Sequence, residues 1–461
     1  NGVRASDVTA VAGITEFGYG QGCTVGDFDC DGLPDLMIAN IGKNKLFQNC
    51  GDGTFLDVTD QAGIVADAWT SSCALADLNS DSWPDLYEVR YLQGEDLFVR
   101  QCHATDQLPR PCPPKEFAAA ADVVWINSGD GRFVAASDTG IDSDRGRGLG
   151  LIVADFDQRP GLDIFVGNDG TEDFLFVNRT AAGSETRFRN EGTLRGLSAN
   201  GRGAMQASMG ITFGDVNRDG EPDLFQSNFL GQSNTLYLGS PDGHFNDATI
   251  DAGLHRNSIP LLGWGAEFLD ADLDGWQDLV VVNGHLEDRT RFGDLYRMQT
   301  RIYRNTGYGR FMPIDPAQLG AWFQKARLGR SLATLDWNRD GRTDFAVSNL
   351  DSAAALLIGD TTPTGNYVKV HLRAVDSARD AIGTEVVIES ADRRWVHQLV
   401  CGDGFQTSNE RTIVVGLGTD TRIEQMTILW PSGRIQRLKS LSANQELFIV
   451  EGREPKNIRD D

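Results

Sequence analysis

An aspartate-rich pattern of nine residues recurs six times in this chain. All but one copy carry Asp or Asn at positions 1, 3, 5 and 9, and most have Gly at position 6. In chain order, loops 1 to 6 are DFDCDGLPD from Asp27, DLNSDSWPD from Asp77, DFDQRPGLD from Asp155, DVNRDGEPD from Asp215, DADLDGWQD from Asp270 and DWNRDGRTD from Asp336. Alternate side chains of a tight turn point inward, and a glycine at position 6 lets the chain bend, as calcium-binding loops require.

Calcium takes six to eight hard oxygen ligands at about 2.3–2.6 Å, which Asp and Asn side chains supply. We therefore predict about five or six structural calcium ions, with position 7 giving its carbonyl. The predicted ligands are Asp27, Asp29, Asp31, Leu33 and Asp35; Asp77, Asn79, Asp81, Trp83 and Asp85; Asp155, Asp157 and Asp163; Asp215, Asn217, Asp219, Glu221 and Asp223; Asp270, Asp272, Asp274, Trp276 and Asp278; and Asp336, Asn338, Asp340, Arg342 and Asp344. The loops have no recurring Glu at position 12 and no flanking helical pattern, so they are not EF-hands. The alternative, a set of solvated Asx-rich turns, does not account for six copies in a fixed register.

Loop 3 departs from the rule, because Arg159 and Pro160 stand at positions 5 and 6. Two interpretations remain open for this loop. Either it binds calcium weakly or not at all, or a guanidinium group itself neutralises the carboxylates.

The sequence around the loops predicts short antiparallel strands. Each loop is followed by an apolar run of strand length, and a second half-pattern contains a Gly-Asp-Gly hairpin signal, as in NKLFQNCGDGTFLDVTDQAGI from Asn44. Each unit therefore has the size of a propeller blade. The chain starts with the tail of a unit (7–14), and the sixth unit stops after ALLIG at 359, so we expect the N-terminal tail to complete a closed ring. We predict six blades, and the long gap between loops 2 and 3 has room for a seventh.

From about Gly365 the loops vanish and alternating strand signals fill the remaining residues. The predicted fold is all-β: a propeller over residues 1–361, followed by a small β-sandwich or barrel over residues 362–461.

Composition narrows the class of protein. Asp and Glu number 66 against 42 Lys and Arg, for a net charge of −24, which argues against nucleic-acid binding and against docking on anionic lipid. No apolar run reaches the roughly 18 residues of a membrane-spanning helix. The chain opens at Asn1 with no leader-like sequence, so we expect any targeting segment to have been removed.

Six of the seven cysteines lie in the first quarter of the chain, and Cys401 stands alone. This distribution indicates up to three disulfides and an oxidising compartment. Cys102 and Cys112, which flank a proline-rich stretch, are the clearest pair. The alternative is a set of buried free thiols in a cytosolic protein.

Several segments resemble the ASPIC/UnbV (cartilage acidic protein) family. RDAIGTEVVI, CGDGF with SNER, VVGLG and ILWPSGRIQRL are similar to its C-terminal domain, while AMQASMGITFGDVNRDG and LGWGAEFLDADLDGWQDLVVVNGH are similar to its propeller of FG-GAP/VCBS repeats. The resemblance implies an acidic, calcium-binding protein that is secreted, extracellular or periplasmic. It also implies an association with extracellular matrix or adhesion or, in bacteria, surface roles.

Our leading functional hypothesis is a non-catalytic interaction or adhesion module for an extracellular protein or glycan, since no G-x-S-x-G, HExxH or phosphate loop is present. One alternative is an enzyme at the propeller axis; its candidate residues are His285, Asp169, Arg147, Glu267 and Arg330. His285 and Arg330 would equally serve to bond loop backbones. Another alternative is carbohydrate binding, with Trp69, Trp83, Trp264 and Trp276 as stacking platforms.

Overall fold

The computed structural model describes residues 6–15, 18–65, 67–103, 109–181, 184–362 and 364–458. Six groups of antiparallel strands, the blades, follow one another along this part of the chain, one for each aspartate loop, and pairing of β2 with β5 joins the first two groups into one eight-stranded sheet. Their strands are β1 (Tyr19–Gly26), β2 (Asp35–Lys43), β3 (Lys45–Asn49) and β4 (Phe55–Asp57) in blade 1; β5 (Asp67–Ala76), β6 (Asp85–Arg90), β11 (Val123–Asn127) and β12 (Phe133–Ala135) in blade 2; β13 (Gly148–Ala154), β14 (Asp163–Asn168), β15 (Phe174–Asn178) and β16 (Phe188–Asn190) in blade 3; β17 (Ile211–Gly214), β18 (Asp223–Gln226), β19 (Thr235–Gly239) and β20 (Phe245–Asp247) in blade 4; β21 (Gly263–Leu269), β22 (Asp278–Asn283), β23 (Arg301–Asn305) and β24 (Phe311–Pro313) in blade 5; and β25 (Gly329–Leu335), β26 (Asp344–Asn349) and β27 (Ala355–Leu357) in blade 6.

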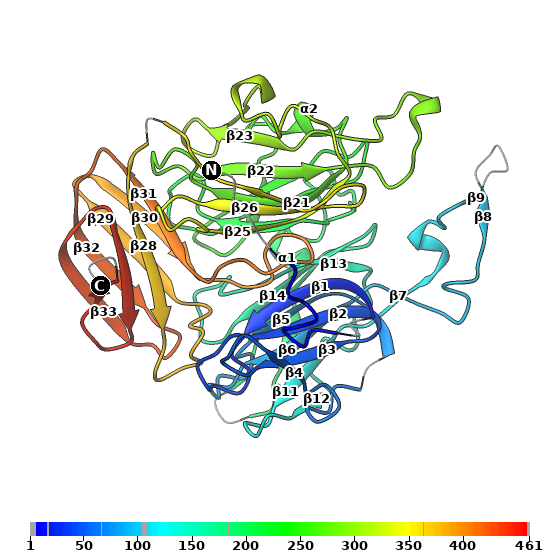
Figure 1. The fold of residues 1–461 in the computed structure, drawn as a ribbon, viewed down its shortest axis with the longest axis horizontal. Coiled ribbons are helices and arrows are strands. Elements are labelled where there is room, and N and C mark those ends of the chain that lie inside the picture. Colours follow the sequence, from blue (N-terminus) through cyan, green and yellow to red (C-terminus); the bar gives the residue numbers. More distant parts are fainter. Residues whose placement is uncertain are drawn as a thin grey trace.

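The predicted all-β propeller is confirmed, with the aspartate loops joining the first and second strands of every blade (Figure 1). The long gap between loops 2 and 3 does not hold a seventh blade in the described residues. It holds the last two strands of blade 2 and a projecting arm with two small sheets, made of β7 (Leu92–Gln93) with β10 (Ala118–Ala119) and of β8 (Cys102–His103) with β9 (Pro109–Arg110). Helical structure is limited to α1 (Gly192–Arg195), α2 (His255–Ser258) and three 3₁₀ turns at Pro114–Glu116, Thr290–Phe292 and Pro316–Gln318 in the same residues. None of the helices described is long and apolar enough to cross a membrane.

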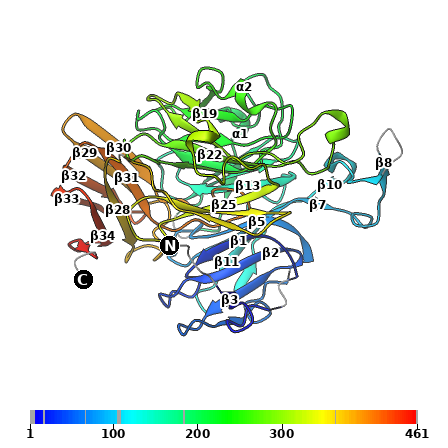
Figure 2. The same cartoon turned by 45° about the horizontal axis from the view of Figure 1, so that its top comes forward.

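The remaining strands form a C-terminal β-sandwich of two four-stranded sheets. One has the order β31-β28-β34-β35 and the other β30-β29-β32-β33. Their bounds are β28 (Asn366–Arg373), β29 (Glu385–Ser390), β30 (Arg393–Gln398), β31 (Ile413–Gly418), β32 (Arg422–Leu429), β33 (Ile435–Ser442), β34 (Gln445–Val450) and β35 (Lys456–Asn457). Figures 1 and 2 show this C-terminal domain against one end of the propeller and the projecting arm at the opposite end. We call the end next to the C-terminal domain the loop end, because the aspartate loops face that domain. The opposite end, with the projecting arm, is the free end.

A segment of the C-terminal domain, Cys401–Thr412, runs into the propeller axis; we call it the axial plug. Cys401 forms two backbone hydrogen bonds with Val153 of blade 3, and Gly404 forms two with Ile211 of blade 4. The plug also contacts the first strands of the other four blades, through Arg411 with Val25 and Leu75, Asn409 with Glu267, and Glu410 with Thr334. Every first strand of the ring therefore contacts the plug.

The junction between blades 6 and 1 differs from the other junctions. At position 2 of the loops, Phe28, Leu78, Phe156 and Val216 are at most 3% exposed, whereas Trp337 of loop 6 is 51% exposed. Here the plug bridges the two blades: the Ser408 hydroxyl accepts the Val25 N–H at 3.3 Å, and the Asn409 side chain accepts the Thr334 N–H at 2.8 Å. The C-terminal domain thus contributes to closing the ring.

The expected closure of blade 6 by the N-terminal tail is not seen in residues 6–15, and Asn1–Ala5 lie outside the described residues. Ala12 instead accepts the Phe55 N–H of blade 1 at 2.7 Å, just as Ala62 accepts that of Phe133 in blade 2. The N-terminal tail therefore packs on blade 1 as the tail of a preceding unit would, and blade 6 has three strands in the described residues.

Cys102 and Cys112 form a disulfide in the projecting arm, as predicted. Cys23, Cys30, Cys50, Cys73 and Cys401 are free thiols. The expectation of up to three disulfides therefore reduces to one observed bond.

Truncating Phe405 of the plug should destabilise the protein. Phe405 is 3% exposed and its ring centroid lies 5.0 Å from that of Trp264, within an apolar cluster at the axis. Phe405→Ala should lower the free energy of unfolding by about 3 kcal/mol, the cost of a large buried cavity, as measured by urea denaturation. Phe292→Ala, at a side chain that is 56% exposed, is the control and should change it by less than about 0.5 kcal/mol. Equal effects would contradict the packed axis.

Candidate metal centres

The six loops share one backbone conformation at position 4. The residues there are Cys30, Ser80, Gln158, Arg218, Leu273 and Arg339, with φ between 56° and 62°. Position 6 is also left-handed in five loops, as Gly or as Ser82, while in loop 3 the corresponding glycine moves to Gly161. Because left-handed backbone is costly for residues with a Cβ atom, the loop is a strained turn held by its hydrogen bonds. The sequence did not predict the left-handed backbone at position 4, because the six residues there share no side-chain property.

The ninth-position aspartates join each loop to its blade. All six are at most 3% exposed and begin the second strand. One carboxylate oxygen accepts the N–H of position 2, at 2.9–3.3 Å. The other accepts an N–H at or just after the third strand, at 2.7–3.0 Å. The same side chain thus fixes the loop and the strand spacing in every blade.

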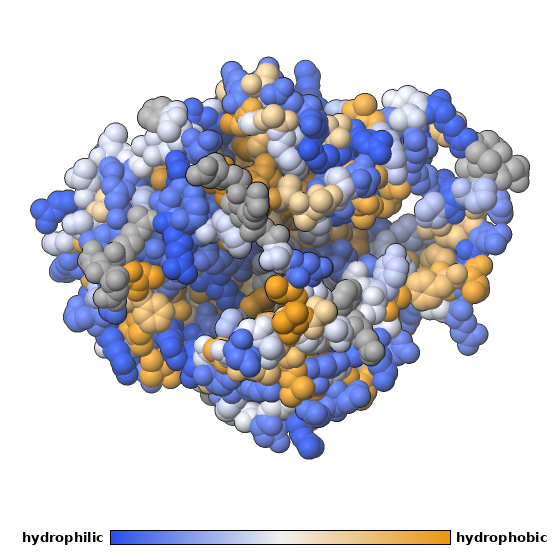
Figure 3. Space-filling model, viewed as in Figure 1, coloured by the Kyte–Doolittle hydropathy of each residue, from blue (hydrophilic) through white to orange (hydrophobic). Residues whose placement is uncertain are grey.

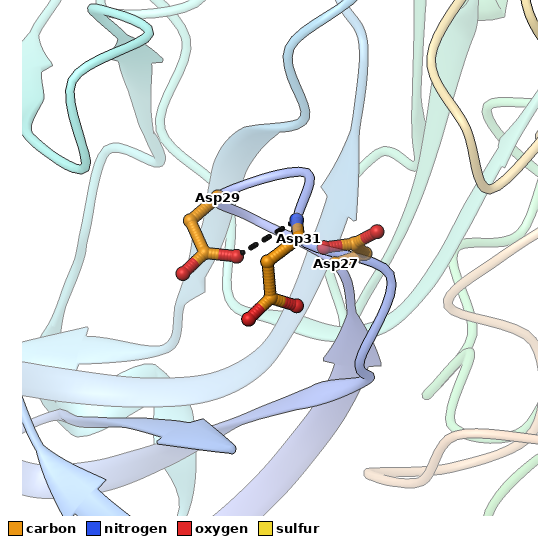
Figure 4. A group of neighbouring side chains, drawn as sticks. All are labelled: Asp27, Asp29 and Asp31. Atoms are coloured by element: carbon orange, nitrogen blue, oxygen red, sulfur yellow. Dashed lines mark hydrogen bonds between the residues drawn. The ribbon is translucent and has the colours of Figure 1, made fainter. Parts of the chain in front are cut away.

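The carboxylates at positions 1, 3 and 5 gather inside the turn. In loop 1, Asp27, Asp29 and Asp31 have ligand oxygens within 4.8 Å of one another, and Figure 4 shows the three side chains around one turn. The equivalent triplet of loop 5 meets the same limit. One oxygen of Asp27 and one of Asp272 are buried without a hydrogen-bond partner among the described residues. An all-oxygen set with orphaned acceptors fits a hard divalent cation such as calcium.

Burial makes these carboxylates costly to ionise without a counter-ion. It raises the pKa of Asp35 and Asp278 to about 7 and that of Asp163 to about 8. Burial, and then the nearby Asp380 carboxylate, raise the pKa of Asp27 to about 6. A bound cation would favour the charged forms and remove this cost.

Loop 3 contains a closed ring of alternating charges. Arg195 contacts Asp157 and Glu191, both at 3.0 Å, and Arg179 contacts the same two residues at 3.3 and 2.7 Å. The side chains of Asp157, Glu191 and Arg195 are 5%, 6% and 10% exposed. Although burial acts to raise it, hydrogen bonds from the two arginines hold the pKa of Glu191 below its usual value. Arg159, the loop's own departure from the pattern, lies 3.8 Å from Asp157 and is 65% exposed.

The signal for this network was present in the sequence but distant from the loop. At the position of Arg195 units 1 and 4 carry Ala62 and Ala252, and at that of Glu191 they carry Val58 and Ala248. An alignment of the repeats reveals these two substitutions, but only the contacts in the folded protein show that they accompany Arg159 in loop 3.

Cationic side chains lie against three further loops. Arg379 is 3.5 Å from Asp27 of loop 1, and Lys369, which is 1% exposed, is 3.3 Å from Asp336 of loop 6. Arg304, 51% exposed, contacts Asp272 and Asp274 of loop 5. Loops 2 and 4 have no ion pair with Lys or Arg in the described residues. The six predicted sites are therefore not equivalent.

The five candidate catalytic residues do not form one site. Arg147 and Asp169 lie together at the free end, where the Asp169 carboxylate accepts the Tyr91 hydroxyl at 2.7 Å. His285 and Arg330 form a second group on blades 5 and 6. Glu267 is bound by Asn409 of the plug at 2.8 Å. An apolar cluster that includes Tyr91, Leu149, Trp264 and Phe405 lies along the axis.

His285 and Arg330 mainly bond backbone groups. The Nδ1 atom of His285 accepts the Glu287 N–H at 2.9 Å, and burial lowers its pKa. The Arg330 guanidinium donates to the carbonyls of Gly284, Gly329 and His285 and lies over the Trp264 ring. Burial lowers the pKa of Arg330 to about 10.

Three of the four candidate stacking tryptophans are covered by the protein's own side chains. Phe98 stacks on Trp69, with ring centroids 5.8 Å apart. Arg330 lies over Trp264, and the guanidinium of Arg218 lies 3.7 Å from the centre of Trp276. Gly129 packs against the fourth, Trp83.

Two parts of the chain match known families. Residues 374–456 match the family described as ASPIC and UnbV, and residues 7–88 match the FG-GAP-like repeat. The chain carries an ASPIC and UnbV domain. The predicted resemblance to the ASPIC/UnbV family is thereby confirmed, in the order expected, with the FG-GAP-like repeat first.

Curated relatives of this chain include cartilage acidic protein 1 from Homo sapiens, 24% identical over 335 residues, which cover 70% of this chain and 47% of the relative. The Xenopus tropicalis protein of the same name is 24% identical over 294 residues, covering 62% and 42%. The chain thus spans about half the length of the curated relatives it matches.

Solved structures share a remote likeness with the chain. An Agrocybe aegerita lectin specific for non-reducing terminal N-acetylglucosamine aligns with a TM-score of 0.41 and 15% identity, over 74% of this chain and 81% of the lectin. A Bacillus licheniformis rhamnogalacturonan lyase aligns with a TM-score of 0.36 and 12% identity, over 95% and 73%.

Removing Arg195 should destabilise blade 3. Arg195→Met leaves the buried Asp157 and Glu191 carboxylates with one guanidinium between them, so we expect the free energy of unfolding to fall by about 3 kcal/mol. Denaturation in urea measures the change. Arg159→Met is the matched control in the same loop and should have little effect, because this side chain is mostly in solvent. An Arg159→Met effect as large as that of Arg195→Met would refute the assignment of the network.

Proposed function

We propose that the protein is a secreted interaction module whose aspartate loops hold calcium ions that stabilise the propeller. The single observation that carries this proposal is the repetition of one oxygen-lined turn in six blades, where one buried carboxylate oxygen of Asp27 has no hydrogen-bond partner among the described residues. We assign calcium to loops 1, 2, 4, 5 and 6, and the arginine network takes its place in loop 3. Five ions would bring the formal charge from −24 to −14.

The proposed calcium has a structural role because each set of ligands belongs to one turn. The ninth-position aspartate connects that turn to the third strand of the same blade, so ion binding would fix the blade geometry. The loop end also faces the C-terminal domain, which leaves little room there for a macromolecular ligand.

The free end is the surface we propose for partner binding. It carries two arms: the first (residues 94–103 and 109–117) comes from blade 2 and the second (residues 286–297) from blade 5, and Arg110 and Glu287 approach to 3.8 Å between them. Both arms expose large apolar side chains, namely Phe98, Val99, Leu286, Phe292 and Leu295, each at least 50% exposed. Figure 3 shows hydrophobic residues on the projecting first arm, as well as at several other places on this face. Exposed apolar groups of this kind favour a protein partner.

An extracellular or periplasmic location suits these features. The Cys102–Cys112 disulfide lies in the exposed first arm, where a reducing compartment would open it. The family resemblance supports the same location.

Calcium removal should lower the melting temperature by about 10 °C or more. Ions that bind the folded state alone stabilise it by about 2.7 kcal/mol per site at a hundredfold excess over Kd, and five sites act together. Differential scanning fluorimetry with calcium and with EGTA measures the change. Equilibrium dialysis of the reloaded protein should give five ions. An unchanged melting temperature would rule out structural calcium.

Binding to extracellular-matrix proteins should depend on the arms. Phe98→Ser with Phe292→Ser should reduce binding to a matrix-protein array at least about tenfold, because exposed aromatic anchors dominate such interfaces. Val134→Ser, on the outer strand of blade 2 and 61% exposed, is the control and should leave binding unchanged. Equal loss with both changes, or selective binding to a glycan array instead, would contradict the proposed surface.

A further inference from the structure

Outside the axial plug, the C-terminal domain makes three hydrogen bonds to the backbone of loop 5. The Gly365 N–H donates to the Asp272 carbonyl at 2.8 Å, and the Gly418 N–H donates to the Leu273 carbonyl at 2.9 Å. The Trp395 indole N–H donates to the Gly275 carbonyl at 3.1 Å. Three separate parts of the C-terminal domain, namely the residue before β28, strand β30 and the end of β31, therefore contact the backbone of one turn.

Three other loops present the N–H of position 1 to the C-terminal domain. The acceptors are side chains of that domain, at 2.7–3.1 Å: Asp380 for Asp27, Gln398 for Asp155 and Glu410 for Asp336. Loop 2 makes no hydrogen bond to the C-terminal domain in the part of the chain that the structure describes. Docking thus depends on the backbone geometry of loops 1, 3, 5 and 6.

The geometry of loop 5 depends on how its charges are neutralised. Asp270, Asp272 and Asp274 have oxygens within 4.8 Å of one another, and one oxygen of Asp272 is buried without a partner among the described residues. Like charges about 4 Å apart repel by roughly 4 kcal/mol at an effective dielectric constant of 20. Two arginines offset part of this repulsion: Arg304 from the surface, and Arg218, which donates to the Gly275 and Asp274 carbonyls. A bare loop 5 would relax by separating its carboxylates, and the carbonyls between them would move.

We propose that a cation in loop 5 locks the C-terminal domain onto the loop end, so that cation loading controls whether the axial plug stays in the propeller axis. This inference rests on the proposed calcium binding and adds a conformational consequence to it. The axial plug belongs to the docked domain and is continuous with β31, which carries Gly418. Loss of the loop 5 contacts therefore loosens the plug as well.

Two ion pairs act in the opposite direction. Arg379 and Lys369 of the C-terminal domain face Asp27 and Asp336 at 3.5 and 3.3 Å, and a cation in loops 1 and 6 would weaken both pairs. No ion pair joins loop 5 to a Lys or Arg of the C-terminal domain within the described residues. A cation can therefore make loop 5 more rigid without weakening an ion pair to the C-terminal domain. For this reason we expect loop 5 to decide whether cation binding strengthens or weakens docking.

Hydrogen exchange of the full chain tests this inference directly. The Gly404 N–H bonds Ile211 at 2.6 Å and the Glu410 N–H bonds Thr334 at 2.9 Å, so their exchange reports the seated plug. Below the melting temperature, EGTA should speed exchange in the plug about tenfold or more, while the fully buried β14 stays protected. Mass spectrometry of peptides covering the plug and β14 separates the two signals.

A matched pair of variants isolates loop 5. Asp274 and Asp81 both occupy position 5, and each accepts the N–H of a tryptophan at position 7, at 2.9 Å. Asn keeps that acceptor and removes the charge. In saturating calcium, Asp274→Asn should speed plug exchange about tenfold, whereas Asp81→Asn, in a loop without docking hydrogen bonds among the described residues, should change it less than about twofold.

Three results would overturn the inference. The first is equal plug exchange in the two variants, and the second is plug exchange in EGTA that rises only together with that of β14. In both cases a fall in melting temperature on chelation would still support calcium binding, so only the docking inference fails. The third is that EGTA changes neither the melting temperature nor the hydrogen exchange of the plug. This result would contradict the proposed role of calcium as well.

Discussion

Every blade depends on a buried carboxylate that accepts two backbone N–H groups, one from its own aspartate loop and one at the end of its third strand. In Asp223, for example, these donors are Val216 and Gly239. The bond to the third strand sets the strand spacing, and the bond to position 2 directs that residue toward the next blade. Where Asn127, Asn178 and Asn305 follow, their side chains also donate to the position 2 carbonyl of the preceding blade. The blade and its junction are therefore built from one repeated hydrogen-bond pattern.

Much of this pattern could be predicted from the sequence. Six copies of the loop motif predicted six blades and the inward position of the acidic side chains, because a fixed register of Asp residues determines both. The C-terminal strands were also predictable, since apolar residues alternate in segments such as NYVKVHLRAV. The disulfide at Cys102 followed from its proximity to Cys112.

Contacts between distant segments could not be predicted. Nothing local to Phe405 indicates that it packs on Trp264, and nothing local to Lys369 indicates that it faces Asp336. The candidate catalytic residues fell into separate groups for the same reason: all five lie in or beside strands at the axis, but sequence spacing does not say what occupies that axis. Closure by the N-terminal tail was inferred from a count of repeat halves, and such a count cannot foresee a plug from another domain.

The position of the axial plug in the chain has a consequence for biosynthesis. The residues that contact all six blades follow the last blade in the sequence, so a nascent chain completes its blades before the segment that fills their centre has been made. Until the plug has been made, the apolar residues at the axis, among them Trp264 and Met209, lack the cover that Phe405 provides. Such an intermediate exposes the kind of surface that chaperones bind during synthesis, and synthesis of the axial plug is the step that allows the propeller to be completed around it.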